Sequence, residues 1–435
     1  MSEPRILVLG AGPAGTAVAL GLSRLGYRVR VVSEWRRFEA VEGVSQRALD
    51  GLHHAGLISA LASAAAPSPR RVVWSGEDRV INQEYLIDRP HFDAALRQDL
   101  RTSGVEPIEA RVRQVESSEH GHRVSLESGV TLEADFLVEA RGRQAPLAGG
   151  RRRGPETLSL LLRWHQPAGP NTSAVESLID GWSWMARMGD GRCYWQITLD
   201  AANAELPAKE YLANYCAWRR GRSALARELF GNGISETGEL YARSSTAILF
   251  HEASGSNWLR VGDAAMAVDP LSGNGIFQSL SSALQAPAVI NTMLRQPDRR
   301  QLARQFHQQR IDHLFLRFAR TGRDFHALEQ RWPEQPFWQA RCSWPDVEPL
   351  HALTDFSQVH VARAPVIRED TIVEAEVVIT TDQPLGIWHL HGLELAPLVR
   401  ALQAGARVEQ VLGGLAAWEQ NMLRHWLGAQ GYRPG

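Results

Sequence analysis

The hydrophobic pattern at the start of the chain predicts a strand, a helix and a second strand in immediate succession. Residues 6–9 are an uninterrupted apolar run, residues 16–25 carry apolar side chains at helical spacing, and residues 28–32 are again strand-like. The first strand leads into the helix through Gly10-Ala11-Gly12-Pro13-Ala14-Gly15. Strand, Gly-x-Gly-x-x-Gly, helix and strand in this order predict a dinucleotide-binding turn.

The glycines of such a turn have separate roles: one makes the tight turn, one lets the backbone approach a pyrophosphate, and one lets the helix pack on the strand. The start of the helix presents its free N–H groups to the anion. An acid after the second strand holds a ribose hydroxyl in this fold. The turn alone leaves FAD and NAD open. We expect the cofactor to contact Gly10, Gly12, Pro13, Ala14, Gly15, Ser33 and Glu34.

Strand-like segments dominate the middle of the chain. Residues 72–88 alternate around a turn, residues 112–132 predict a small antiparallel sheet, and residues 134–143 predict a buried strand that returns to the first sheet. Residues 150–255 are rich in Trp, Leu and Ile, and they predict a separate sheet inserted into the nucleotide domain.

Two tryptophans of this inserted segment share one face of their strand. Side chains alternate along a strand, so Trp182 and Trp184 point to the same side. They either line an aromatic substrate pocket or pack in the core between the sheet and its neighbour.

A second glycine turn follows near residue 270. A strand ends at Gly262-Asp263, and the turn Ser272-Gly273-Asn274-Gly275 opens a long helix predicted over residues 277–293. Asp263 can accept hydrogen bonds from a ribityl hydroxyl. The amides from Gly273 to Ile276 converge at a helix start, where they suit negative charge on a reduced flavin ring.

The C-terminal part predicts a small separate module. Residues 299–330 are amphipathic helix, and the proline-rich residues 331–349 predict a linker or wrap-around segment. Strands near residues 359–379, followed by helices over 393–403 and 408–426, suggest a winged-helix-like domain. Its second helix has little positive charge, so a protein surface or a structural cap fits better than DNA.

The fold class that follows is α/β, with three domains. A Rossmann-like dinucleotide-binding domain would comprise residues 1–150 and 256–345, with a small sheet at 72–90. Residues 151–255 would form an inserted, mainly antiparallel β-sheet substrate domain, and residues 346–435 a small C-terminal α+β domain.

Composition removes several classes of function. The 47 Lys and Arg residues against 48 Asp and Glu give a net charge of −1, with no excess for nucleic acid or a membrane surface. The three cysteines are scattered, so we expect no metal site, no disulfide framework and a reducing, cytoplasmic location. No apolar run approaches the ~18 residues of a membrane span.

Over about residues 1–345 the chain resembles class A flavin-dependent monooxygenases and their tryptophan-halogenase relatives. The resemblance implies non-covalent FAD and a nucleotide domain of the glutathione-reductase type. It implies Glu34 at the adenosine ribose, Arg47 and Arg89 near the flavin and pyrophosphate, Asp263 at the ribityl-phosphate region, and Pro270 to Ile276 along the isoalloxazine. The motifs that carry it are Gly10 to Gly15, residues 43–57, Asp88-Arg89 with Asp93, residues 140–143, and Gly262-Asp263 through Gly275.

The chain departs from the family pattern at three places. Glu34 comes one residue later than the usual acid, and Arg141-Gly142 stands where the family has the Asp-Gly motif tied to nicotinamide nucleotides. The external electron donor, NAD(P)H or a reductase, therefore stays open. The halogenases need an active-site lysine after the first helix, and this chain has none there, which disfavours halogenation.

Within the superfamily the chain looks like the flavoprotein monooxygenases that help to build tryptophylquinone cofactors. That likeness implies hydroxylation of a protein-bound tryptophan through a flavin C4a-hydroperoxide, with molecular oxygen and the small quinone-bearing subunit of quinohemoprotein amine dehydrogenase as partners. Indole is electron-rich, so no catalytic triad is expected. Ser272 and Asn274 would frame the flavin, and Trp182 and Trp184 would line the approach of the ring. The alternatives are a hydroxylase of a free aromatic molecule, an FAD-dependent reductase, a halogenase-like enzyme and a non-enzymatic peptide carrier.

Overall fold

The computed structural model describes residues 3–36, 39–145, 149–231 and 238–433, without the side chains of Gln144 and Ser272. The chain forms two compact units, one of residues 1–287 with 311–348, the other of residues 288–310 with 349–435. Within these described residues no helix is both long and apolar enough to cross a membrane.

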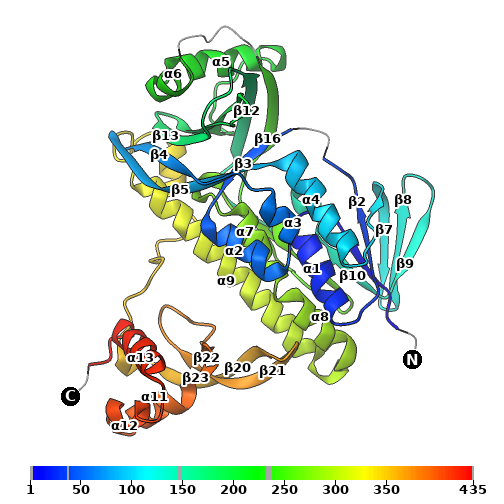
Figure 1. Cartoon of the computed structure of the whole chain (residues 1–435), viewed down its shortest axis with the longest axis vertical. Coiled ribbons are helices and arrows are strands. Elements are labelled where there is room, and N and C mark those ends of the chain that lie inside the picture. The colour runs from blue at the N-terminus through cyan, green and yellow to red at the C-terminus, as the bar shows by residue number, and fades with distance from the viewer. Residues whose placement is uncertain (1–2, 37–38, 146–148, 232–237, 434–435) are drawn as a thin grey trace. The chain divides into compact units, whose positions relative to one another are not determined.

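The first unit contains a five-stranded parallel sheet, which lies near the N-terminus (Figure 1). The register places Leu9 beside Val32 on one side and Glu139 on the other, so the turns that follow these strands meet at one edge. The prediction that residues 134–143 return to the first sheet is confirmed. The strands, in spatial order, are β18 (Trp258–Arg260), β10 (Phe136–Glu139), β1 (Ile6–Leu9), β2 (Val29–Ser33) and β6 (Ile108–Glu109).

Helices and a small sheet surround these strands. The predicted antiparallel sheet near residues 112–132 is present as β7 (Val112–Ser118), β8 (Gly121–Leu126) and β9 (Thr131–Ala134), and its apolar face packs on Leu7 and Leu9. The helices of this region are α1 (Pro13–Arg24), α2 (Gln46–Ala55), α3 (Ile58–Ala62) and α4 (Arg89–Thr102).

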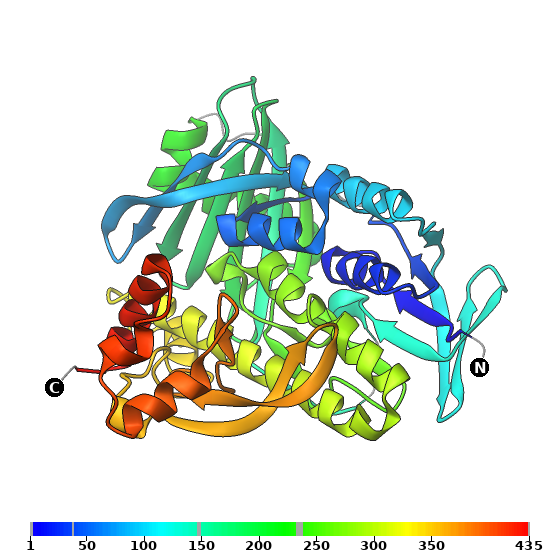
Figure 2. The ribbon, with the colours of Figure 1, turned by 60° about the horizontal axis from the view of Figure 1, so that its bottom comes forward.

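The inserted sheet has eight strands and is larger than predicted. The hairpin of residues 72–88 is present, but it belongs to this sheet, because β4 pairs in parallel with β13. The small sheet assigned to the nucleotide domain at residues 72–90 is therefore one end of the inserted sheet (Figure 2). Its strands, in spatial order, are β16 (Glu239–Ser244), β12 (Thr157–His165), β15 (Arg192–Asp200), β14 (Gly181–Arg187), β13 (Thr172–Leu178), β4 (Ser68–Trp74), β5 (Glu77–Asp88) and β3 (Val41–Val44).

Different layers cover the two faces of this sheet. Buried residues of α5 (Leu212–Arg222) and α6 (Ala224–Phe230) pack on one face, where Trp195 is fully buried. Trp182 and Trp184 pack on the other face with Phe337 and Trp338 of α10 (Pro336–Cys342). Residues 331–349, predicted as a linker, therefore contain a packed helix. A smaller sheet is built from β11 (Arg151–Arg153), β17 (Ile248–Phe250) and β19 (Met266–Ala267).

The long helix predicted over residues 277–293 is two helices, α7 (Gly275–Ala283) and α8 (Ala286–Arg295). Pro287 explains the break, because proline lacks the N–H of the helical ladder and its ring clashes with the preceding turn. The amphipathic helix predicted over 299–330 is α9 (Arg300–Ala327). Short 3-10 turns lie at Lys209–Tyr211 before α5, at Pro297–Arg299 between α8 and α9, and at Phe356–Gln358 before the first strand of the second unit.

The second unit has the predicted combination of strands and helices. Its core gathers apolar residues around Val399 and Leu412. The helix predicted over 408–426 is divided at Gly413-Gly414, where two glycines weaken helical continuity. The elements are the antiparallel pair β20 (His360–Arg368) and β21 (Thr371–Ile379), the short pair β22 (His389–Leu390) and β23 (Leu393–Glu394), and helices α11 (Leu395–Gln403), α12 (Val408–Leu412) and α13 (Ala417–Ala429).

Candidate functional site

The first glycine turn has the three-part geometry that its sequence predicts. Gly10 adopts φ +106°, and a Cβ there would lie 2.4 Å from the carbonyl oxygen of Ala140. A Cβ on Gly15 would lie 1.9 Å from the carbonyl oxygen of Gly10, so helix and strand approach closely at that point. A Cβ on Gly12 would meet nothing within 4 Å. Gly12 is the N-cap of α1, and its open side faces a cavity, which is the cradle a pyrophosphate requires.

This cavity has a volume of about 1420 Å³ and extends from the glycine turn to the inserted sheet. Gly10 to Ala14 line one end, and Trp182 and Trp184 line another part. Residues 240–245 all line the cavity. Because side chains of a strand point alternately to opposite faces, consecutive residues can all line one cavity only along the edge of the strand, so the edge of β16 borders the cavity. The chamber is continuous past the turn, as an extended dinucleotide and a substrate beside it would require.

Residues directly after β2 line one part of the cavity. Ser33 and Glu34 line the cavity, and the Glu34 carboxylate lies 3.7 Å from the Arg111 guanidinium. Glu34 therefore faces the chamber with a cation beside it, and its contact with a ribose hydroxyl stays a prediction.

Arg89 lines the cavity and is buried in an ion-pair cluster. It contacts Glu42 at 3.1 Å and Asp93 at 2.8 Å, and Arg36 contacts Asp93 at 3.0 Å. Burial acts to raise the pKa of Glu42, but the cations Arg89, Arg243 and Arg36 outweigh it and hold that pKa below its usual range. The cluster therefore stays charged, and Arg89 is fixed in place by carboxylates.

Asp263 and Arg143 form the next part of the wall. Asp263 belongs to the 3-10 turn η3 (Gly262–Ala264) and Arg143 to η1 (Gly142–Gln144). The guanidinium lies 3.5 Å from the Asp263 carboxylate and donates to the Val268 carbonyl at 3.1 Å, while the Ser279 hydroxyl donates to Asp263 at 3.3 Å. Burial raises the pKa of Asp263, and Arg143 and the Ser279 hydroxyl oppose that rise. The carboxylate keeps acceptor capacity for a polyol hydroxyl in the cavity.

The second glycine turn lies on the same wall. Pro270, Gly273, Gly275 and Ile276 line the cavity, as Asp263 does. Both α7 and η3 contact α1, so this turn and the first glycine turn, which are far apart in sequence, meet at the same cavity. The turn runs through η4 (Pro270–Ser272), which the Asp269 carboxylate caps by accepting from the Leu271 N–H at 2.9 Å.

Several predicted site residues are placed differently. Asn274 is the N-cap of α7 and is not among the described cavity-lining residues, and the side chain of Ser272 lies outside the described structure. Arg47 is exposed on α2, because that helix buries its opposite face through Ala48, Leu49 and Leu52, so it is not brought to the cavity.

Trp182 and Trp184 are 2% and 9% exposed, and they line the cavity while packing in the core. The interpretation as core residues is confirmed, and a substrate pocket at this pair stays a prediction. The Trp184 indole N–H donates to the buried Glu84 carboxylate at 3.3 Å, and Arg70 lies 3.7 Å from Glu84. The Trp182 indole nitrogen has no hydrogen-bond partner in the described part of the chain. These rings give the chamber an apolar wall with a carboxylate behind it.

Sequence reasoning missed most of the charge in this chamber. Arg143 had a local signal, since it directly follows the Arg141-Gly142 motif, but Glu84 and Arg243 had none. The described lining holds nine arginines against six carboxylates, so the chamber is net positive. The arginines are Arg36, Arg70, Arg89, Arg97, Arg111, Arg113, Arg141, Arg143 and Arg243. Within the described residues no cluster of three or more His, Cys, Asp or Glu is arranged for a metal ion.

Residues 46–373 match the family model for tryptophan halogenase, and the chain therefore belongs to the tryptophan halogenase family. It is an FAD-dependent oxidoreductase. Among solved structures it is similar to "Peptidyl tryptophan dihydroxylase QhpG essential for tryptophylquinone cofactor biogenesis", with 62% identity, a TM-score of 0.89, and coverage of 99% of this chain and 100% of that one.

More distant relatives share the fold. The tryptophan 2-halogenase of Chondromyces crocatus is 23% identical over 78% of this chain and 71% of its own length. The FAD-dependent oxidoreductase LodB of Marinomonas mediterranea is 24% identical over 77% and 96%. The flavin-dependent halogenase CmlS superposes with a TM-score of 0.79 at 16% identity, over 99% of this chain and 95% of that one. The family resemblance expected from the motifs is confirmed.

Proposed function

We propose that this chain is an FAD-dependent monooxygenase that hydroxylates the indole ring of a tryptophan held in a polypeptide. The observation that carries the proposal is the 62% identity to QhpG across nearly the whole chain. We propose further that the substrate is the small quinone-bearing subunit of a quinohemoprotein amine dehydrogenase, during biogenesis of its tryptophylquinone cofactor. An external donor, NAD(P)H or a separate reductase, would reduce the flavin.

The chamber supports a substrate larger than a free amino acid. It continues beyond the two glycine turns to the aromatic wall of Trp182 and Trp184 and to the edge of β16. An indole could stack against this wall while the rest of a polypeptide lies along the chamber. The aromatic wall excludes water from the ring, and Glu84 fixes the orientation of Trp184 by accepting its N–H.

The composition of the chamber favours hydroxylation over halogenation. The only lysine of the sequence, Lys209, is exposed on a 3-10 turn, and the described lining contains none. A halogenase of this family would need a lysine near the substrate, whereas an electron-rich indole can be oxygenated without one.

FAD, when bound, would supply the activation of molecular oxygen. The chain would hold the pyrophosphate at Gly12 and the start of α1, the adenosine ribose at Ser33 and Glu34, and the ribityl chain at Asp263. The amides from Gly273 to Ile276 would face the isoalloxazine and favour negative charge on it. The tasks left to the protein are positioning of the ring and exclusion of water.

Co-expression with a candidate small subunit, followed by intact-mass measurement, tests the proposal. We expect one or two added oxygen atoms on that subunit, derived from isotopically labelled dioxygen, and none on a subunit whose target tryptophan is replaced by phenylalanine. A purified, FAD-loaded enzyme that leaves the subunit mass unchanged contradicts the proposal. Turnover that continues without dioxygen would instead indicate a reductase.

A further inference from the structure

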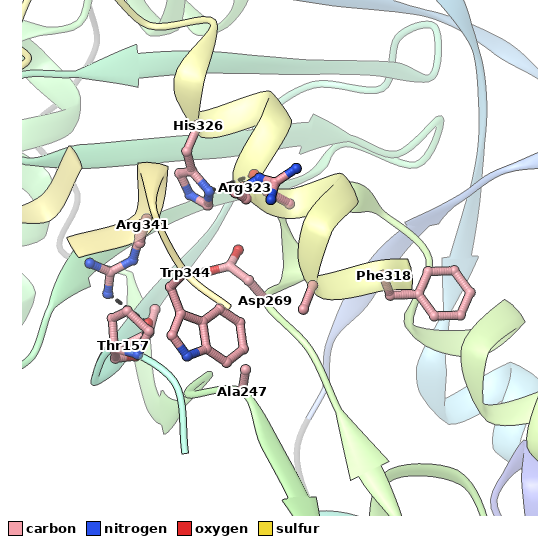
Figure 3. Close-up of a pocket in the computed structure, with 11 residues that line it drawn as sticks. Thr157, Ala247, Asp269, Phe318, Arg323, His326, Arg341 and Trp344 are labelled. Carbon is pink, nitrogen blue, oxygen red and sulfur yellow. Dashed lines mark hydrogen bonds between the residues drawn. The ribbon is translucent and has the colours of Figure 1, made fainter. Parts of the chain in front are cut away.

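A second, much smaller cavity lies behind the flavin-facing turn, and two unpaired buried atoms line it. Its volume is about 20 Å³, and its walls come from α9, α10, β12 and the Asp269 segment (Figure 3). His326 of α9 is 2% exposed and Arg341 of α10 is 4% exposed. Among the residues that the structure describes, the Nε2 atom of His326 and the Nε atom of Arg341 have no hydrogen-bond partner.

The protonation of His326 follows from its other ring nitrogen. Nδ1 lies 2.7 Å from the Gly322 carbonyl oxygen, which can only accept, so Nδ1 carries the hydrogen. Burial lowers the pKa of His326, which keeps the ring neutral. Nε2 is therefore a lone-pair acceptor directed into an interior space. An unpaired acceptor is costly in such a place.

Arg341 presents the matching donor. Its terminal nitrogens are used by Asp200 at 3.1 Å and by the Thr157 hydroxyl at 2.7 Å, which leaves Nε unused. A neutral acceptor and a cationic donor therefore face one space too small for an organic ligand. A space of ~10–15 Å³ suffices for one water that has two to four polar partners.

Asp269 connects this space to the cofactor chamber. It lines both the small cavity and the large one, and it precedes Pro270 of the flavin-facing turn. Figure 3 shows its carboxylate between the side chains of His326, Arg341 and Trp344. One Asp269 oxygen caps η4 through the Leu271 N–H, and a carboxylate has further acceptor sites.

We propose that the small cavity holds one water molecule that donates to His326 Nε2 and to Asp269 and accepts from Arg341 Nε. The water ties the turn from Asp269 to Ser272 to α9 and α10, and His326 is the positioning residue for that turn. This inference rests on the proposed place of the flavin beside the turn. Protonation of His326 would put an N–H donor opposite Arg341. Asp269 and the Gly322 carbonyl act to raise the pKa of His326, but burial, the largest cause, and Arg341 lower it.

Two substitutions separate the hydrogen bond from the packing. His326 makes edge contacts with Phe337 and Trp338, at ring-centroid distances of 5.7 Å and 5.9 Å, which phenylalanine can keep. In His326→Phe the acceptor is lost, and we expect the dissociation constant for FAD to rise by about tenfold. In His326→Gln an oxygen acceptor is restored, and we expect FAD affinity within about threefold of the unchanged protein. Equal FAD affinity in the protein and in His326→Phe overturns the positioning role.

A measurement on the unchanged holoenzyme keeps the proposal testable if a variant fails to fold. Nitrogen-15 spectra of the histidines should show His326 with Nδ1 protonated and Nε2 unprotonated from acid to neutral pH. A high-resolution crystal structure should show one water within hydrogen-bond distance of His326, Arg341 and Asp269. An empty cavity, or a hydrogen on Nε2, overturns the proposal. Neither readout depends on tryptophan oxidation, so failure of the proposed function would be seen separately.

Discussion

Gly12→Ala separates cofactor binding from folding at the first glycine turn. The new Cβ would meet no protein atom within 4 Å, and Gly12 has φ −76°, which alanine adopts freely. The methyl group would instead enter the chamber at the start of α1, where we propose that the pyrophosphate binds. We therefore expect normal folding and weakened FAD binding.

The magnitude follows from the hydrogen bonds at the helix start. Displacing the pyrophosphate by one methyl group breaks at least one charge-assisted bond to a backbone N–H, worth ~1.5–3 kcal/mol. The FAD dissociation constant should rise by roughly tenfold to hundredfold, since each 1.4 kcal/mol is about tenfold. Alanine is a poorer N-cap than glycine, so the free energy of unfolding of the apoprotein should fall by at most about 1 kcal/mol.

Fluorescence titration of the apoprotein with FAD gives the affinity, and urea unfolding gives the stability. Gly15→Ala is the matched control, because its Cβ would lie 1.9 Å from the Gly10 carbonyl oxygen. This control should destabilise the apoprotein by ~1–3 kcal/mol. Wild-type FAD affinity in Gly12→Ala would refute the assignment of this turn to the pyrophosphate.

Three further predictions concern residues that line the chamber or the small cavity beside it. Trp184→Phe should lower the free energy of unfolding by about 1 kcal/mol more than Trp182→Phe, because only Trp184 donates its indole N–H, to Glu84; paired urea titrations measure the difference. Because the pKa of Asp263 is raised in the folded state, the folded apoprotein binds an extra proton above about pH 4, and its free energy of unfolding falls as pH rises through that raised pKa. Asp263→Asn should flatten this pH dependence in urea titrations made at several pH values. An unchanged pH dependence would contradict the raised pKa of Asp263. Arg341→Met leaves a buried carboxylate of β15 without its cation and should cost ~3–5 kcal/mol, measurable as a lower thermal midpoint.

The features that the sequence alone could predict are those encoded locally. The turn from Gly10 to Gly15 was predictable because each glycine is required by contacts within one strand–helix unit and the adjacent strand. The placement of the β4–β5 hairpin could not be predicted, because β4 pairs with β13, about a hundred residues later, and the residues around β4 do not indicate which strand it pairs with. The break near Pro287 could have been predicted from the proline itself, but the apolar pattern continues across it and indicated one helix.

Charged side chains were the least predictable part of the site. Arg47 follows a small-residue turn and was expected at the cofactor, but the apolar positions of α2 direct it to solvent. Arg143 was not singled out, although it contacts both Asp263 and the Val268 carbonyl. Which side of a short helix faces a chamber depends on tertiary packing, and spacing along the chain does not specify it.

The excess of arginines over carboxylates in the chamber lining gives the site a positive charge that does not depend on pH in the physiological range. Guanidinium groups stay protonated throughout the physiological range, so the local field persists from acidic to alkaline media. Such a field attracts anions over a distance set by the Debye length, ~8 Å at physiological ionic strength. Capture of the doubly negative cofactor should therefore slow as salt is added, while its rate changes little with pH.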